Sequence, residues 1–224
     1  MAGALPSRVV FDVNGTLSDL SPMQEYFTRR GLPRPSASLW FATVLRDGFA
    51  LAAAGAFQPF SALAEAAARE LFWPTLGEAE SRRAAAEVMA GFAELSVHPD
   101  VAGGVAALGR LGCKLAALTN GSASNAAALL ERAGLRDAFG PVLSVDDAGA
   151  WKPERGAYEL AARVLDQRPE ELLLVAAHPW DIDGAGRAGL ATAWLNRAGG
   201  PYPGVFRAPD LVVRDLGALA DELG

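Results

Sequence analysis

The sequence contains a single cysteine, Cys113, which excludes an internal disulfide and suits a reducing compartment. It has no apolar run of the ~18 residues that a membrane-spanning helix needs. The start, MAGALPSRVVF, carries neither the basic segment nor the sustained apolar segment of a secretory signal. Basic residues are outnumbered, because the formal net charge is −6 at pH 7. We therefore expect a cytoplasmic protein that binds neither nucleic acid nor an anionic membrane surface.

The remaining composition is that of a folded globular protein. Hydrophobic residues make up 51% of the chain and charged residues 21%. A length of 224 residues allows one good core with an inserted subdomain, or two small domains. A small anionic ligand stays compatible with the acidic balance if the chain forms a local cationic pocket.

Short apolar runs alternate with helical patterns over most of the chain. The runs are rich in Val and Leu, and turn signals bound each of them, which is typical of buried parallel strands. The expected strands cover residues 8–13, 114–119, 141–145, 172–177, 192–195 and 211–213. The helical patterns between them cover residues 100–112, 122–134, 154–166 and 183–189. This alternation predicts an α/β fold with a doubly wound parallel sheet, a Rossmann-like core.

One long segment interrupts the alternation. Residues 20–95 are almost entirely helical in pattern and contain no convincing strand. We therefore predict a core formed by residues 1–19 and 96–224, with an inserted helical cap formed by residues 20–95. A cap in this position would close over the carboxyl ends of the strands and exclude water from them. A packing subdomain without any gating role is the alternative.

Polar side chains follow four of the expected strands where each strand ends. They are Asp12 after the first strand, Thr119 and Asn120 after the second, Lys152 after the third, and His178, Trp180 and Asp181 after the fourth. Asp12 alone is also compatible with simple turn capping. The carboxyl ends of parallel strands meet at one edge of a sheet, however, and open α/β sheets bind ligands there. The four loops together therefore predict an active site at this edge.

These motifs resemble those of the haloacid dehalogenase superfamily, and within it the L-2-haloacid dehalogenase (type II) branch. The likeness covers nearly the whole chain, including the helical cap. The matching positions are Asp12, Gly15, Thr16 and Leu17 of the nucleophile loop, Thr119-Asn120-Gly121, Lys152-Pro153 with Tyr158, Trp180-Asp181, and Trp194 to Arg197.

Two positions separate a dehalogenase from the magnesium-dependent phosphatases of the same superfamily. In those phosphatases a second aspartate, two residues after the nucleophile, protonates the leaving group and then activates water. This chain has the amide Asn14 at that position. The phosphatases also supply a magnesium carboxylate where this chain has Ala177. Magnesium depends on carboxylate oxygens, and the site offers few beyond Asp12. We therefore expect no metal and no cofactor.

The dehalogenase chemistry suits the residues that remain. An aspartate with an ordinary pKa near 3.9 is ionised at pH 7, so Asp12 can attack the halogen-bearing carbon and form an ester. Lys152 would offset the repulsion between this carboxylate and an anionic substrate. Backbone N–H groups of the Asn14–Thr16 loop and the Thr119 hydroxyl are candidates to bind the substrate carboxylate. Asn120, Tyr158 and Trp180 join the expected substrate-binding set.

The cap departs from the family pattern. Well-characterised relatives carry a halide-binding arginine directly after the tryptophan of the first long cap helix, and this chain has Phe41 there. Arg46 lies five residues on, about 140° further round a helix, and is either a shifted halide ligand or a surface charge. Trp40, Phe41, Phe60 and Trp180 form the alternative, an apolar pocket for halide and alkyl group. Trp40 is equally compatible with a core position.

The fourth loop departs as well. Relatives show Ser-x-Asn before the Trp-Asp pair, and this chain has Ala176, Ala177 and His178. An imidazole, with an ordinary pKa near ~6.5, is well matched to act as the base that hydrolyses the ester. Asp181 or Asp19 would orient it. The alternatives are a His178 that only bonds a loop carbonyl, and an Asp181 that activates water directly.

The sequence as a whole predicts a hydrolase of carbon–halogen bonds acting on short 2-haloacids. The resemblance implies that an L-2-haloacid becomes a D-2-hydroxy acid and that the protein forms a homodimer, which no residue by itself requires. The alternatives are a magnesium-dependent phosphatase, a hydrolase of a strained cyclic amino acid such as azetidine-2-carboxylate, and a non-catalytic binding protein.

Overall fold

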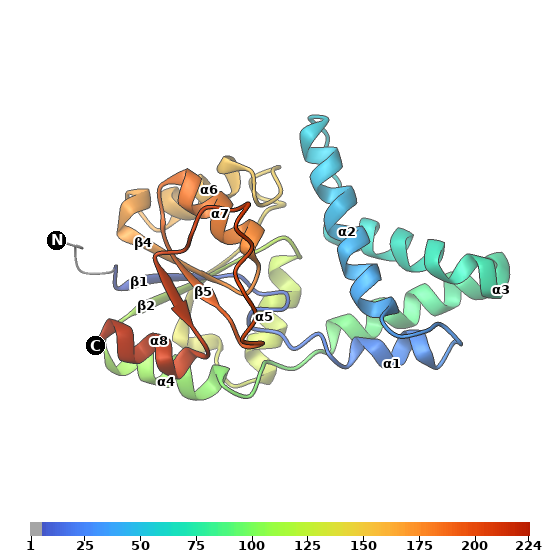
Figure 1. Ribbon diagram of the computed structural model, residues 1–224, viewed down its shortest axis with the longest axis horizontal. Coiled ribbons are helices and arrows are strands. Elements are labelled where there is room, and N and C mark those ends of the chain that lie inside the picture. The colour runs from blue at the N-terminus through green and yellow to red at the C-terminus, as the bar shows by residue number, and fades with distance from the viewer. Residues whose placement is uncertain (1–5) are drawn as a thin grey trace. The chain divides into compact units, whose positions relative to one another are not determined.

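The computed structural model of the chain describes residues 6–224, and these fall into two compact units. One unit comprises the residues up to Ser18 together with Val97–Gly224, and the other is Asp19–Ser96. The first unit carries the sheet and the second consists of helices (Figure 1). None of the helices between residues 6 and 224 combines the length and apolar character needed to cross a membrane.

The sheet has six parallel strands in the order β3-β2-β1-β4-β5-β6. The strands are β1 (Arg8–Phe11), β2 (Lys114–Thr119), β3 (Phe139–Ser144), β4 (Leu172–Ala176), β5 (Ala191–Leu195) and β6 (Leu211–Val213). The chain moves outward from β1 in one direction through β2 and in the other through β4. The strand order therefore reverses beside β1, and such a reversal leaves a crevice at the carboxyl ends of the strands. The predicted doubly wound sheet is confirmed.

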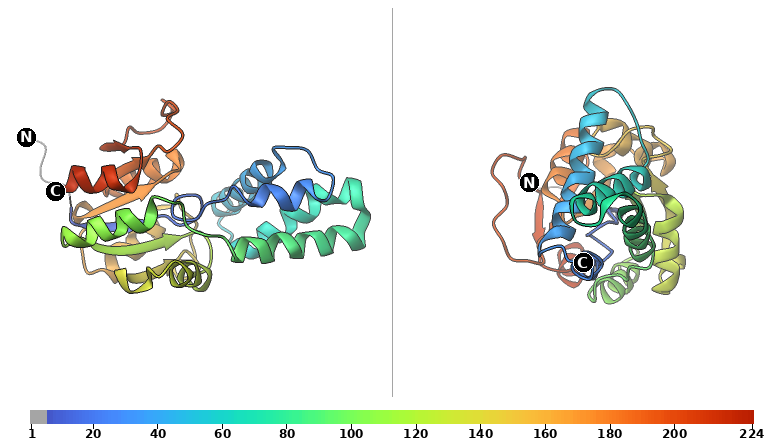
Figure 2. Two further views of the ribbon diagram at one scale, coloured as in Figure 1. Left: turned by 90° about the horizontal axis from the view of Figure 1, so that it is seen from below. Right: turned by 90° about the vertical axis from the view of Figure 1, so that its right-hand side faces the viewer.

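Helices cover both faces of this sheet, and alternate strand residues form the two cores. Val9 and Phe11 pack with α4 (Val101–Arg110), α5 (Ala123–Arg132) and α8 (Leu216–Leu223). Val10 faces the other way, toward α6 (Arg155–Val164) and α7 (Pro179–Ala188). Figure 2 shows α4 and α8 side by side. This period of two is what a strand buried on both faces requires.

Two helices differ from the sequence prediction. Helix α7 begins at Pro179, four residues before the predicted start, since proline suits the first helical position. Trp180 and Asp181 therefore lie in its first turn. Helix α8 was not predicted, and it begins where the Asp215 side chain accepts a 2.7 Å hydrogen bond from the Ala218 N–H. Two short 3₁₀ helices cover Arg136–Ala138 and Pro169–Glu171.

The second unit contains α1 (Met23–Thr28), α2 (Ser36–Ala53) and α3 (Phe60–Ala93). Its α3 joins two helical stretches across a kink at Gly77, whose φ of 72° favours glycine. Aromatic rings fill the interior, where Phe27 stacks on Phe72 at 5.3 Å between ring centroids. The unit thus has a hydrophobic core of its own.

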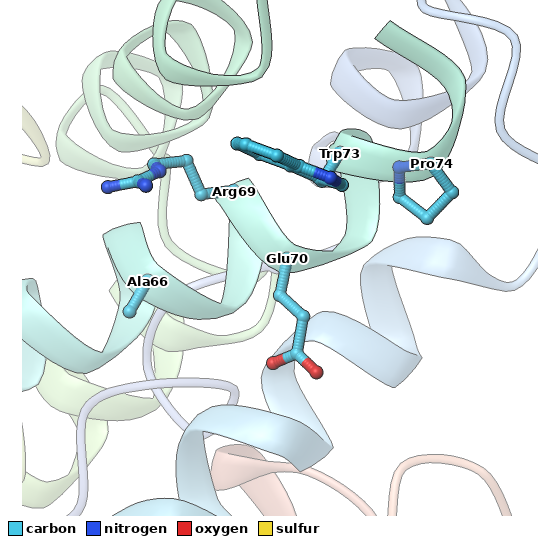
Figure 3. Close-up of a pocket in the computed structure, with 5 residues that line it drawn as sticks. All are labelled: Ala66, Arg69, Glu70, Trp73 and Pro74. Atoms are coloured by element: carbon cyan, nitrogen blue, oxygen red, sulfur yellow. The ribbon is translucent and has the colours of Figure 1, made fainter. Parts of the chain in front are cut away.

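A pocket of about 580 Å³ lies along α3 (Figure 3). Its lining residues are Ala66, Arg69, Glu70, Trp73 and Pro74. Arg69 and Trp73 point to the same side of the helix, as residues four apart do. Trp73 is half exposed. The surface of this pocket is mostly apolar. The homodimer that the family resemblance implies stays a prediction.

The close approach of α4 and α8 gives a first test. A Cβ added at Gly104 would lie 2.1 Å from Leu216 Cβ and 2.9 Å from the Leu216 carbonyl carbon, so α8 would have to shift. We expect Gly104→Ala to lower the free energy of unfolding by about 1–3 kcal/mol. Gly103→Ala is the matched control on the same helix, because nothing lies within 4 Å of its added Cβ. It should raise stability by about 0.5–1 kcal/mol. Urea unfolding followed by circular dichroism measures both, and equal effects would contradict the packing.

Candidate active site

Asp12 is the first residue after β1 and is buried. Its N–H still bonds to the Val175 carbonyl at 3.0 Å, so the sheet holds its backbone. The chain then turns sharply, because the N–H groups of Thr16, Leu17 and Ser18 all donate to the Val13 carbonyl. This turn brings the Thr16 hydroxyl back to Asp12, where it donates a 2.6 Å hydrogen bond to Oδ2.

Lys152 is completely buried and lies between two carboxylates. Its Nζ donates to Asp12 Oδ1 at 2.7 Å, to Asp181 Oδ2 at 2.7 Å and to the Leu118 carbonyl at 2.9 Å. An ammonium group has three hydrogens and no acceptor. All of its donors are therefore used, by Asp12 just after β1, by Leu118 in β2 and by Asp181 in the first turn of α7, and the lysine is held as a cation.

The surroundings shift the pKa values of Asp12 and Asp181 in opposite directions. Burial by itself raises the pKa of Asp12, but the charges of Lys152 and His178 and the hydrogen bonds from Lys152 and Thr16 outweigh it and lower that pKa. Burial, aided by the Asp12 charge, outweighs Lys152 and raises the pKa of Asp181. Burial would lower the pKa of Lys152, yet the two carboxylates raise it above its usual value. Asp12 is thus the carboxylate that stays ionised most readily.

Three further residues hold Lys152 and Asp181. The Asn120 side chain accepts from the Lys152 N–H at 2.9 Å and donates to the Lys152 carbonyl at 3.3 Å. Tyr158 donates to Asp181 Oδ1 at 2.6 Å, and burial first, then Asp181, raises the pKa of that phenol well above its usual value. Gly184 permits this packing, because a Cβ there would lie 2.5 Å from Pro153 Cβ. Asn120 and Tyr158 therefore fix the cation and its second carboxylate; their contact with substrate stays a prediction.

His178 lies beside the loop that follows β1. Its Nε2 is 2.7 Å from the Asn14 carbonyl and 3.7 Å from Asp12 Oδ2. A carbonyl only accepts hydrogen bonds, so Nε2 carries a hydrogen and is the donor. The ring stacks on Trp180 at 5.2 Å between centroids, and Lys152 Nζ lies 5.9 Å from the Trp180 ring centroid. Trp180 thus contacts both cation and imidazole.

Polar side chains at the ends of β1 and β2 approach the backbone of Gly121 closely. A Cβ added at Gly121 would lie 3.2 Å from Asn14 Nδ2 and 3.3 Å from Thr119 Oγ1. The Thr119 hydroxyl also accepts from the Gly121 N–H at 2.9 Å. The lack of a side chain at Gly121 therefore lets the Asn14 amide and the Thr119 hydroxyl approach its backbone closely.

The predicted cap residues occupy different environments within the helical unit. Trp40 is buried, and its indole N–H donates to the Ala64 carbonyl at 2.8 Å, which makes it a core residue of that unit. Phe60 is also buried, and Phe41 lies 6.5 Å from it between ring centroids. Arg46 is exposed and pairs with Asp47 at 2.7 Å. The roles of all four in substrate or halide binding stay predictions.

Sequence reasoning gave no role to Arg197, Asp100 or the backbone of Ala177. Arg197 donates to the Thr16 carbonyl at 2.8 Å and pairs with Asp100. The Ala177 N–H donates to the Thr16 hydroxyl at 2.9 Å, and the Ala177 carbonyl accepts from the Trp194 indole at 3.0 Å. The family-like stretch from Trp194 to Arg197 was the one sequence signal for this group.

Comparison with known proteins agrees with this geometry. The family model for haloacid dehalogenase-like hydrolases matches residues 7–189. The (S)-2-haloacid dehalogenase of Pseudomonas sp. (strain YL) is 31% identical over 217 residues, which is 95% of this chain and 92% of that protein.

Two solved structures are similar over almost the whole chain. The L-2-haloacid dehalogenase RSc1362 has a TM-score of 0.90 at 27% identity and covers 99% of both chains. That from Xanthobacter autotrophicus with chloropropionic acid covalently bound has a TM-score of 0.80 at 28% identity, over 97% of this chain and 98% of the other. With its parallel sheet, its strand-end carboxylates and these matches, the chain belongs to the haloacid dehalogenase-like hydrolase family.

Proposed function

We propose that this protein hydrolyses the carbon–halogen bond of short 2-haloacids through an ester on Asp12, releasing halide and a 2-hydroxy acid. The buried ammonium of Lys152, bonded to both Asp12 and Asp181, is the observation that carries the proposal. It supplies a metal-free cation beside a buried carboxylate, which suits attack on an anionic organic halide. Relatives named as (S)-2-haloacid dehalogenases support the substrate class.

In the first step, an oxygen of Asp12 attacks carbon 2 of the substrate. The new carbon–oxygen bond forms as the carbon–halogen bond breaks, and the bonding pair leaves with the halide. Lys152 keeps Asp12 ionised and reduces its repulsion from the substrate carboxylate. The Asn14 amide and the Thr119 hydroxyl, which lie close together beside Gly121, are the groups we assign to that carboxylate.

In the second step, water attacks the carbonyl carbon of the ester and the 2-hydroxy acid leaves, so that the Asp12 carboxylate is regenerated. The step needs a base for the proton of water. We assign this role to His178, whose Nε2 must first release the Asn14 carbonyl and give up the hydrogen it donates there before that nitrogen can take a proton from water. Asp181 is the alternative, because its raised pKa makes it the better proton carrier of the two carboxyl groups.

The donor set argues against the phosphatase alternative. Asn14 and Ala177 stand where a second aspartate and a magnesium carboxylate are required. Lys152 already occupies an oxygen of both remaining carboxylates. Within residues 6–224, no cluster of three His, Cys, Asp or Glu side chains is arranged to hold a metal ion.

The proposal also includes a cytoplasmic location and a homodimer.

Halide release from a substrate panel tests the function. We expect turnover of chloroacetate and of the (S) enantiomer of 2-chloropropionate. Activity after chelator treatment should stay within a factor of about two of that of the untreated enzyme, because no step uses a metal. Asp12→Asn should release no halide while its circular dichroism stays unchanged. Activity that requires Mg²⁺ on a generic phosphate ester would contradict the proposal, and ring opening of azetidine-2-carboxylate without halide release would replace it.

His178 has a test of its own. If it is the base, His178→Ala still forms the ester, so it should release about one halide per enzyme in a burst and then stall. Rapid-quench halide assays and intact-protein mass spectrometry measure the burst and the ester. Normal steady-state turnover would pass the base role to Asp181. Slow halide release without ester accumulation would make His178 a residue that orients the nucleophile loop.

A further inference from the structure

Arg197, two residues after β5, joins two parts of the chain that lie far apart in sequence. Its Nη1 donates to the Thr16 carbonyl at 2.8 Å. Its Nε and Nη2 donate to Asp100 Oδ1 and Oδ2, both at 3.0 Å. Only about a fifth of either side chain is exposed. A two-point guanidinium–carboxylate pair of this kind fixes direction as well as distance.

Asp100 is itself anchored at the amino end of α4. Its Oδ2 also accepts from the Leu216 N–H at 3.1 Å. Burial alone would raise the pKa of Asp100, but the hydrogen bonds from Arg197 and Leu216 outweigh it and hold that pKa below its usual value. The Arg197 guanidinium is therefore paired with an ionised Asp100 carboxylate that a backbone hydrogen bond from Leu216 holds in place.

The Thr16 hydroxyl carries the restraint to the nucleophile. It accepts the Ala177 N–H at 2.9 Å, so its single hydrogen is directed to Asp12 Oδ2 at 2.6 Å. Arg197 holds the carbonyl of the same residue. The Thr16 carbonyl is thus held by Arg197, and the Thr16 hydroxyl is held against Asp12.

We propose that Arg197, held by Asp100, is a positioning residue of the active site that sets the orientation of the Asp12 carboxylate through Thr16. The inference rests on the proposed function, since it assigns Asp12 the role of nucleophile. This role requires arginine, because the single side-chain nitrogen of a lysine cannot bond both Asp100 oxygens and the Thr16 carbonyl in this geometry.

Neighbouring contacts tie the same two segments together. The His98 N–H donates to the Leu17 carbonyl at 2.9 Å, and Ser18 forms a β-bridge with Val97. Residues 17–18, which follow the Asp12 loop, are therefore paired with residues 97–98, which follow the helical unit in the chain. Arg197 extends this pairing to Thr16, the residue that touches Asp12.

The test compares Arg197→Gln, Arg197→Lys and Asp100→Asn with the wild type in single-turnover halide release, which reports ester formation. We expect Arg197→Gln to slow the burst about 10–100-fold, the scale of a misplaced reacting group. KM should change less than about threefold, because the lost bond acts on the reacting carboxylate. Arg197→Lys should recover part of the rate. Asp100→Asn added to Arg197→Gln should cost little more, since the two act as one unit.

Arg214→Gln is the matched control, because it removes an exposed arginine paired with Asp215 in the same unit. Urea unfolding of every variant separates stability from rate. Variants that lose stability but keep the burst rate of Arg214→Gln would overturn the inference, leaving Arg197 a structural brace. If Arg197→Gln does not fold, Arg197→Lys and Asp100→Asn decide by the same criterion. A wild-type enzyme that releases no halide would overturn the proposed function itself, and this inference with it.

Discussion

The ammonium of Lys152 is completely buried between the carboxylates of Asp12 and Asp181, and the rest of the site is arranged around it. Burying an ion costs several kcal/mol unless close partners satisfy it. Removing one member of such a group costs roughly 3–5 kcal/mol, because an uncompensated charge stays inside. The three side chains therefore act as one unit in stability as well as in chemistry. The same ammonium favours the ionised form of Asp12, which the proposed ester chemistry needs.

The parallel sheet supplies the geometry for this unit. Asp12 follows β1, the Leu118 carbonyl belongs to β2, and Asp181 lies in the first turn of the helix after β4. The strand order reverses beside β1, so these segments meet at one sheet edge even though long stretches of chain separate them. Lys152 arrives from the loop after β3, with its backbone held by Asn120. Leu118 and Asp181 lie in regular structure, and the Asp12 backbone is hydrogen-bonded to β4, so the sheet and α7 position the partners of Lys152.

Much of this arrangement could be predicted from the sequence. Short apolar runs mark the strands, and polar residues directly after them, such as Asp12, indicate the edge at which the active site is proposed. The start of α7 at Pro179 was missed because its apolar pattern is weak and proline alone is ambiguous. The pairing of Arg197 with Asp100 was not predictable, since 97 residues separate them and the motif that contains Arg197 does not indicate its partner. The direction of the His178 ring also depends on tertiary contacts, because a loop carbonyl fixes it.

The central claim is that Asp12 forms a covalent bond with the substrate while Lys152 balances its charge. The most direct measurement is a single turnover in heavy-oxygen water, with enzyme in excess, followed by mass spectrometry of the peptide that contains Asp12. Water attacks the ester at its carbonyl carbon, so one heavy oxygen should enter Asp12 and the first hydroxy acid released should be unlabelled. Heavy oxygen found directly in that first product, with Asp12 unlabelled, would contradict the account.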